Sequence, residues 1–200
     1  MNIKNWLLLY LISFVTPALH AAPIVYFDFD GDGLQDVSTT AALGSSLTAS
    51  VYVSNVDNFG GGLISWGTEI NFDSLILSAS SYTLASSWPL AGIDNNIDNT
   101  TATIELLGSS FSAQTGTLKL ADIFFDTSSA GSAAISLNQL FPDNNTFSGF
   151  TLADGTDLDA DINFSLANAT INVSAVPLPA SLILFMSGLI GFLGFIKKKK

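Results

Sequence analysis

A nine-residue stretch near the start of the chain, DFDGDGLQD, carries four aspartates at a spacing that suits a cation. They fall at positions 1, 3, 5 and 9 of an EF-hand-type loop, and Gly33 falls at position 6, where such a loop turns sharply. Calcium prefers this arrangement because several hard oxygen ligands converge on it. The pattern predicts a weak calcium site of the extracellular kind, whose ligands are the carboxylates of Asp28, Asp30, Asp32 and Asp36 and the carbonyl oxygen of Leu34.

The stretch departs from an EF-hand at position 12, where Thr39 replaces the bidentate glutamate, and no helical pattern flanks it. A solvated acidic turn between the first two strands is the alternative interpretation. A second acidic group lacks a glycine at the turn position, and we interpret it as a hydrated strand edge in preference to a cation site. Its members are Asp154, Asp157, Asp159 and Asp161.

Residue types for catalysis are scarce in this chain. It has no cysteine, and its one histidine, His20, falls in a segment expected to be removed. Ser-His-Asp and Cys-His catalysis and ordinary zinc sites are therefore excluded from the mature protein. Glu69 and Glu105 are the only glutamates that could act as a glycosidase pair. Each lies in a predicted strand without a recognisable motif, so we expect surface positions and no enzymatic activity.

Three aromatic residues raise the question of sugar binding, because aromatic faces stack on pyranose rings. Trp66 shares a predicted core face, whereas Tyr82 and Trp88 lie in a serine-rich stretch and could be exposed. Tyr82 and Trp88 are therefore the candidates for a sugar-stacking platform. The default interpretation is that both rings fill the core or pin a loop, and sugar binding is the alternative.

Residues 22–175 consist of short alternating segments separated by turn-forming residues, with almost no helical periodicity. Residues 46–55 place every second side chain, from Leu47 to Val53, on one face, and residues 63–72 place Ile64, Trp66, Ile70 and Phe72 on one face. This pattern predicts an all-β, antiparallel sandwich. Further strands are expected at Leu75–Ala79, Thr101–Leu107, Leu118–Phe125, Ala133–Leu137, Phe147–Leu152 and Ile162–Val173.

The order of these segments carries a family resemblance. VYVSNVDNFGGGLISWGTEINFDSLILSASS and, later, TGTLKLADIFFDTSSAGSAAISL are similar to the opening and the close of the cohesin-like family, which is related to bacterial carbohydrate-binding modules. The resemblance covers roughly Ala42–Val173. It implies a jelly-roll β-sandwich of about eight or nine strands, with a fibronectin-like or other sandwich as the alternative. Dockerin-contact residues cannot be mapped onto this sequence, so dockerin binding is not carried over.

Both ends of the chain predict export. Lys4, the apolar run Trp6–Val15 and the small residues around Ala21 are typical of a signal peptide, residues 1–21, cleaved after Ala21. At the other end, Ala180–Ile196 is an uncharged segment long enough for a helix of about 25 Å, near the lower limit for spanning a bilayer. Lys197–Lys200 would stay in the cytoplasm by the positive-inside rule.

The C-terminal segment also resembles a known sorting signal. VPLPA, an apolar helix and a basic end occur in the order seen in PEP-CTERM proteins, although Leu178 replaces the glutamate of the namesake motif and lysine replaces the usual arginine. The resemblance implies that a membrane-embedded exosortase removes the helix. A permanent tail anchor is the alternative. The motif residues are Val176, Pro177, Leu178, Pro179 and Ala180.

The predicted mature domain, residues 22–175, is strongly acidic. It keeps Lys119 alone against 17 acidic residues, a formal charge of −16, which excludes nucleic acid and anionic lipid surfaces as partners.

We expect three parts: a signal peptide (1–21), a sandwich domain (22–175) and a sorting signal (176–200). The resemblance to PEP-CTERM proteins implies a precursor tethered to the inner membrane of a Gram-negative bacterium and a product at the cell surface or in the extracellular or biofilm matrix. The domain would be structural or adhesive, and it would bind extracellular polysaccharide or another surface protein; the alternative is a carbohydrate-binding module. The ligand, the oligomeric state and the fate of the cleaved end stay open.

Overall fold

A computed structural model of the protein describes residues 21–93, 95–140, 149–164 and 167–175, together with residues 184, 185 and 187. The predicted signal peptide up to residue 20, the sorting motif Val176–Ala180 and the basic end therefore lie outside the described residues. In the part of the chain that is described, no helix is both long and apolar enough to cross a bilayer.

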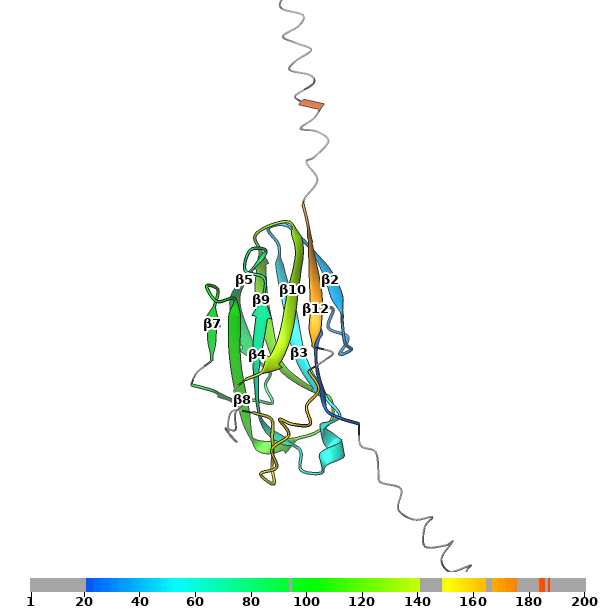
Figure 1. Ribbon diagram of the computed structural model, residues 1–200, viewed down its shortest axis with the longest axis vertical. Helices are drawn as coiled ribbons and strands as arrows, with labels where there is room; N and C mark the ends of the chain where they lie inside the picture. The colour runs from blue at the N-terminus through cyan, green and yellow to red at the C-terminus, as the bar shows by residue number, and fades with distance from the viewer. Residues whose placement is uncertain are drawn as a thin grey trace, which may run out of the picture.

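The described residues form a β-sandwich, which confirms the predicted fold class (Figure 1). Twelve strands are present among them, more than predicted, because several are very short. The elements are β1 (Ile24–Asp28), β2 (Ser38–Ala42), β3 (Ser46–Ser54), η2 (Val56–Phe59), β4 (Leu63–Phe72), β5 (Leu77–Leu84), β6 (Leu90–Ala91), β7 (Asn96–Asp98), β8 (Thr103–Gln114), β9 (Leu118–Thr127), β10 (Gly131–Gln139), β11 (Thr151–Leu152) and β12 (Asn168–Ser174).

Two sheets make up the sandwich. The four-stranded sheet has the order β1-β3-β9-β5, and the eight-stranded sheet has the order β2-β12-β10-β4-β8-β6, with β11 beside β4 and β7 beside β8. Neighbouring strands are antiparallel except β2 and β12, which run parallel. The chain thus begins in one sheet with β1 and enters the other with β2.

The core lies between the sheets and follows the predicted alternation. Ala49, Val51 and Val53 of β3 are fully buried, as are Trp66 and Ile70 of β4. Each such side chain contributes about 1.5–3 kcal/mol when it is fully removed from water, less for alanine. The prediction that Ile64 shares the core face of β4 was wrong. A register shift between Leu63 and Ser65 turns Leu63 into the core and leaves Ile64 only half-buried.

Three strands were not predicted, because their residues lack an apolar alternation: β2, β6 and β7. β7 falls among asparagines and aspartates, which are turn-forming residues, and two asparagine side chains flank it. The Asn95 amide bonds both the N–H and the C=O of Leu107, and the Asn99 amide bonds both groups of Ala79. The two side-chain amides make the pair of backbone hydrogen bonds that a neighbouring strand would otherwise make. A pattern of hydrophobic residues cannot reveal this.

Candidate functional site: an acidic crossover loop and a polar sheet face

The aspartate-rich stretch forms the crossover between the two sheets. Asp28 ends β1, which pairs with β3 in the four-stranded sheet, and Ser38 begins β2, which pairs with β12 in the eight-stranded sheet. The loop therefore fixes where the chain leaves one sheet and joins the other. Tyr26 supports it, since its hydroxyl donates to the Gly33 carbonyl at 2.8 Å while its ring stacks on Tyr52.

Asp28 organises the loop. Its side chain is 1% exposed, and three backbone amides donate to it. The Oδ1 atom accepts from Asp30 N at 3.1 Å and Gly31 N at 2.7 Å, and the Oδ2 atom accepts from Gly33 N at 2.9 Å. These bonds give the buried carboxylate oxygens hydrogen-bond partners, which a polar group removed from water requires.

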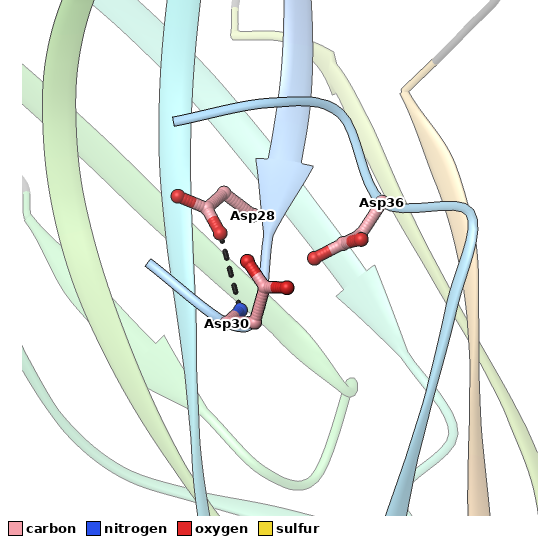
Figure 2. A group of neighbouring side chains, drawn as sticks. All are labelled: Asp28, Asp30 and Asp36. Carbon is pink, nitrogen blue, oxygen red and sulfur yellow. Dashed lines mark hydrogen bonds between the residues drawn. The ribbon is translucent and has the colours of Figure 1, made fainter. Parts of the chain in front are cut away.

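Three of the four predicted aspartates converge. One carboxylate oxygen each from Asp28, Asp30 and Asp36 lies within 4.8 Å of the others, and Figure 2 shows the three side chains around a common space. Asp36 is held by the Phe29 amide, which donates to its Oδ2 atom at 2.8 Å. These three residues could bind a metal ion.

Asp32 is not part of this group, and its Oδ1 atom accepts from Leu34 N at 2.8 Å in an exposed turn. The carbonyl oxygen of Leu34, the remaining predicted ligand, stays a prediction. Burial, Tyr52 and the nearby carboxylates of Asp28 and Asp32 raise the pKa of Tyr26 above its ordinary value. The tyrosine therefore stays neutral and keeps donating to the loop.

The second acidic group does not gather into a cluster among the described residues. Asp154, Asp159 and Asp161 lie in turns and Asp157 forms an isolated bridge with Thr151, so the group is not the edge of a regular strand that we predicted. The Asp154 Oδ1 atom accepts from Thr156 N at 2.9 Å, and the amide and hydroxyl of Thr156 lower the pKa of Asp154. Asp159 is partly buried, which raises its pKa, and its Oδ1 atom accepts from Phe150 N at 2.7 Å.

Trp88 fills the core, as the default interpretation of the sequence has it, and is not an exposed sugar-stacking residue. Trp88 is 2% exposed, its indole N–H donates to the Lys119 carbonyl at 2.8 Å, and its ring meets Trp66 edge-on at 6.2 Å. Tyr82 lies in β5 rather than in a loop, half-buried against the core. The two rings therefore do not form an exposed platform, because the ring of Trp88 is packed inside the core of the sandwich.

The two glutamates lie opposite each other on neighbouring strands, a pairing that the sequence did not reveal. Glu69 of β4 and Glu105 of β8 are register partners in an antiparallel ladder, and both are half-exposed, as expected of surface positions. The Asn71 amide donates to Glu69 Oε1 at 2.8 Å. Retaining glycosidases place two carboxylates about 5 Å apart, but they do so in a substrate cleft. Here the pair lies on the outer face of a sheet.

Two rows of side chains define what we call the polar face. It lies on the outside of the eight-stranded sheet, where four neighbouring strands, β10, β4, β8 and β7, stay in register. The first row is Asn138, Glu69, Glu105 and Asn96, and the second is Ser136, Asn71, Thr103 and Asp98.

A depression of about 220 Å³ adjoins the polar face. It lies between β4 and β10 and is lined by Asn71, Phe72, Asp73, Ala134 and Ser136. Neither glutamate lines it, so the pair is not enclosed by a cavity there.

Comparison with known proteins identifies the fold. The structure is similar to a type I cohesin–dockerin complex of Clostridium thermocellum, Coh-OlpA-Doc918, with a TM-score of 0.55 and 12% identity over 76% of this chain and 99% of the other. It is also similar to the non-cellulosomal cohesin of the archaeon Archaeoglobus fulgidus, with a TM-score of 0.54 and 13% identity over 77% and 92% of the two chains. The fold is cohesin-like.

A third similar structure is the Clostridium thermocellum complex Coh-OlpC-Doc435, with a TM-score of 0.55 and 11% identity over 78% of this chain and 95% of the other. No protein-family model matches the sequence, and no curated protein matches it significantly. The likeness is therefore one of structure, and it confirms the cohesin-like sandwich expected from the order of the strands.

Proposed function

We propose that this protein is an exported, non-catalytic binding module, which holds a partner protein on the polar face of its cohesin-like sandwich. One observation carries the proposal. The polar face is a regular, solvent-facing surface over four strands in register, and neither of its two glutamates lines the depression beside it. Several structures with the same fold are described as cohesin–dockerin complexes, in which such a sandwich is bound to another protein.

The two ends of the chain support a proposal for where this module is located. We propose that the signal peptide delivers residues 22–175 across the inner membrane and that an exosortase then cuts near Val176–Ala180. The module would end at the cell surface or in the extracellular matrix of a Gram-negative bacterium. The order of motif, apolar segment and basic end supports this, as does the lack of any basic residue other than Lys119 in the mature domain.

We also propose that calcium binds at Asp28, Asp30 and Asp36 and serves a structural purpose. The loop is the crossover between the sheets, so a cation there would fix both β1 and β2. The three amides that donate to Asp28 already hold one carboxylate in place. A pre-organised set of oxygen atoms is what calcium ligation requires.

Site-resolved photo-crosslinking in the producing host tests the binding function. A photoreactive phenylalanine is placed at Asn138 or Thr103 on the polar face, and at Thr48 or Thr83 on the outer face of the other sheet as matched controls. We expect the polar-face positions to capture one and the same protein and the control positions not to. Equal capture from both faces, or no capture from either, would overturn the proposed docking face.

Intact mass spectrometry of the same protein, from strains with and without exosortase, tests the sorting. A species that starts at Ala22 and ends within residues 177–180, and that is lost without the enzyme, is the expected result. A chain that keeps Lys197–Lys200 in both strains would show that the tail is a permanent anchor.

A further inference from the structure

The strand β2 is an open edge of the eight-stranded sheet (Figure 1). It pairs with β12 on one side, and the described part of the chain places no strand on its other side. The Val37 carbonyl accepts from β12 at 3.0 Å and the Leu43 amide donates to β12 at 2.9 Å, so the odd-numbered residues bond that strand. Ser38 and Thr40 therefore turn their backbone N–H and C=O groups outward, where no described residue bonds them.

The other three sheet edges are covered by other groups. At β1, the Asp36 amide donates to the Phe27 carbonyl at 2.8 Å. At β5, the Asn99 side chain bonds both backbone groups of Ala79, and beside β8 the Asn95 side chain fills the gap between the short strands β6 and β7. Natural sheets block their edges in such ways, because an open edge is a template for another strand. β2 has none of these protections, since it contains no proline, no charged residue and no bulge.

Two exposed apolar side chains flank β2. Val37 is 67% exposed and Leu43 is 37% exposed. By the alternation of a strand, both lie on the same side as Ala41, which packs against the core. A strand added to the open edge would cover both side chains. The edge therefore offers apolar contacts on its core-facing side in addition to backbone hydrogen bonds.

The sequence of this edge is complementary to itself. When two copies of β2 pair antiparallel about a two-fold axis at Thr40, Val37 of one copy lies opposite Leu43 of the other. Thr40 then faces Thr40 of the second copy, and these outward-facing residues exchange a pair of N–H···O bonds. Val37 and Leu43 occupy a non-hydrogen-bonded position, where opposing side chains approach most closely. Only this antiparallel register of β2 with itself places the two exposed side chains opposite each other.

We propose that β2 is a self-association edge, to which a second copy of this chain adds its own β2, antiparallel and centred on Thr40. The contact is isologous, so both copies use the same surface and the dimer closes. It joins the two eight-stranded sheets into one continuous sheet by strand addition. β12 separates β2 from β10, the nearest strand of the polar face, so this inference goes beyond the proposed function and is independent of it.

The charge of the domain sets the salt dependence of this contact. β2 and its neighbour β12 carry no charged residue, so the edge itself has no like charges to bring together. The predicted mature domain as a whole has a formal charge of −16, which opposes association at longer range. Salt screens this repulsion, and the dimer should therefore form more readily at higher ionic strength.

Cysteine crosslinking tests both the dimer and its register, because the natural chain has no cysteine. The Thr40→Cys variant of the full-length chain, in a zwitterionic detergent, is oxidised and analysed on a non-reducing gel. The Cα atoms of a hydrogen-bonded antiparallel pair are about 5.5 Å apart, a distance that a disulfide spans. We expect a covalent dimer of Thr40→Cys chains, formed faster at higher salt.

Two single-cysteine variants are matched controls: Ser38→Cys in β2 and Thr83→Cys at an exposed position of β5. In the proposed register, Ser38 lies opposite Ala42 of the second copy, and two Ser38 residues are about 14 Å apart along the strands. Both controls should therefore crosslink about tenfold more slowly than Thr40→Cys. A mixture of Ser38→Cys chains with Ala42→Cys chains should crosslink readily. Association through any other part of the chain would not produce this pattern.

Charges at the flanks give an independent check. Adding Val37→Glu and Leu43→Glu to Thr40→Cys opposes like charges and should slow disulfide formation, whereas Val37→Glu with Leu43→Lys opposes unlike charges and should restore it. The proposal is overturned if Thr40→Cys reacts no faster than Thr83→Cys, if Ser38→Cys alone reacts as fast as Thr40→Cys, or if the charge-swapped variant stays as slow as the doubly acidic one. Capture of a different protein by Thr40→Cys in the producing host, in place of a second copy, would also overturn it.

Discussion

Asp28 and Gly33 are five residues apart, and the Gly33 amide donates to Asp28 Oδ2 at 2.9 Å. The bond closes the crossover loop around a buried carboxylate, with Gly33 in the left-handed backbone region at φ 80°. The conformation of the loop is thus set by its own backbone, and a cation would bind to groups that are already in place.

Calcium should stabilise the protein. With a dissociation constant of about 0.1–1 mM, 5 mM calcium adds about 1–2 kcal/mol to the free energy of unfolding. Thermal unfolding of the full-length chain, in calcium and in chelator, measures the gain. Asp30→Asn and Asp36→Asn should abolish it, whereas Asp154→Asn, which can still accept from Thr156, should not. Identical unfolding temperatures in calcium and chelator would exclude the site.

Gly33 should tolerate other residues according to their backbone preference. A Cβ there would meet no atom within 4 Å, so a substitution acts through the backbone alone. Gly33→Ala should cost about 1–2 kcal/mol, and Gly33→Asn less, since asparagine adopts the left-handed region more readily. Chemical denaturation gives both values. Equal costs would mean that the loop changes its conformation on substitution.

Neutralising one glutamate of the pair should stabilise the unbound protein. Glu105→Gln removes a like-charge contact and should add about 0.2–1 kcal/mol to the free energy of unfolding at low salt, with a smaller gain at high salt. Once Glu105 is neutral, changing Glu69→Gln should bring little further gain. A double-mutant cycle by denaturation measures this coupling, and strictly additive effects would show that the two charges do not interact.

Trp88 should matter for stability and not for sugar binding. Trp88→Ala removes a buried ring and its bond to the Lys119 carbonyl, and should cost about 3–5 kcal/mol. Trp88→Phe keeps most of the volume and should cost less. Measuring the free energy of unfolding of both variants shows which of them loses more stability. Glycan binding by the wild-type chain that disappears in a folded Trp88→Phe variant would restore the sugar-platform interpretation.

Two aspartates should titrate on opposite sides of their ordinary pKa. The amides of Thr100 and Thr101 donate to Asp98 and lower its pKa, so the stability that Asp98 contributes at neutral pH is lost as the pH falls through this lowered value. Burial raises the pKa of Asp159, so its protonated form favours the fold and its ionisation reduces stability as the pH rises. Carboxyl ¹³C NMR should resolve both midpoints. A shared midpoint would contradict the two environments.

The strand alternation was enough to predict the sandwich, since β3, β4, β9 and β10 bury the apolar residues of one face. It could not predict β2 or β7, whose residues are small or polar and whose edges are held by backbone and asparagine amides. The aspartate spacing predicted the converging residues Asp28, Asp30 and Asp36, because the turn depends on local chemistry. The Glu69–Glu105 pair depends on the register between two strands, which local sequence does not encode.

The position of β12 gives the sandwich a mechanical property. β12 lies between β2 and β10, paired over five residues with the first and six with the second, and the described domain ends just beyond it at Ala175 (Figure 1). A tension applied along the chain past Ala175 runs parallel to β12, so it shears both ladders at once and cannot unzip them one hydrogen bond at a time. A partner held on the polar face would transmit its load through β4 and β10 into the same ladders, which makes the C-terminal strand the part of the domain that resists being pulled away.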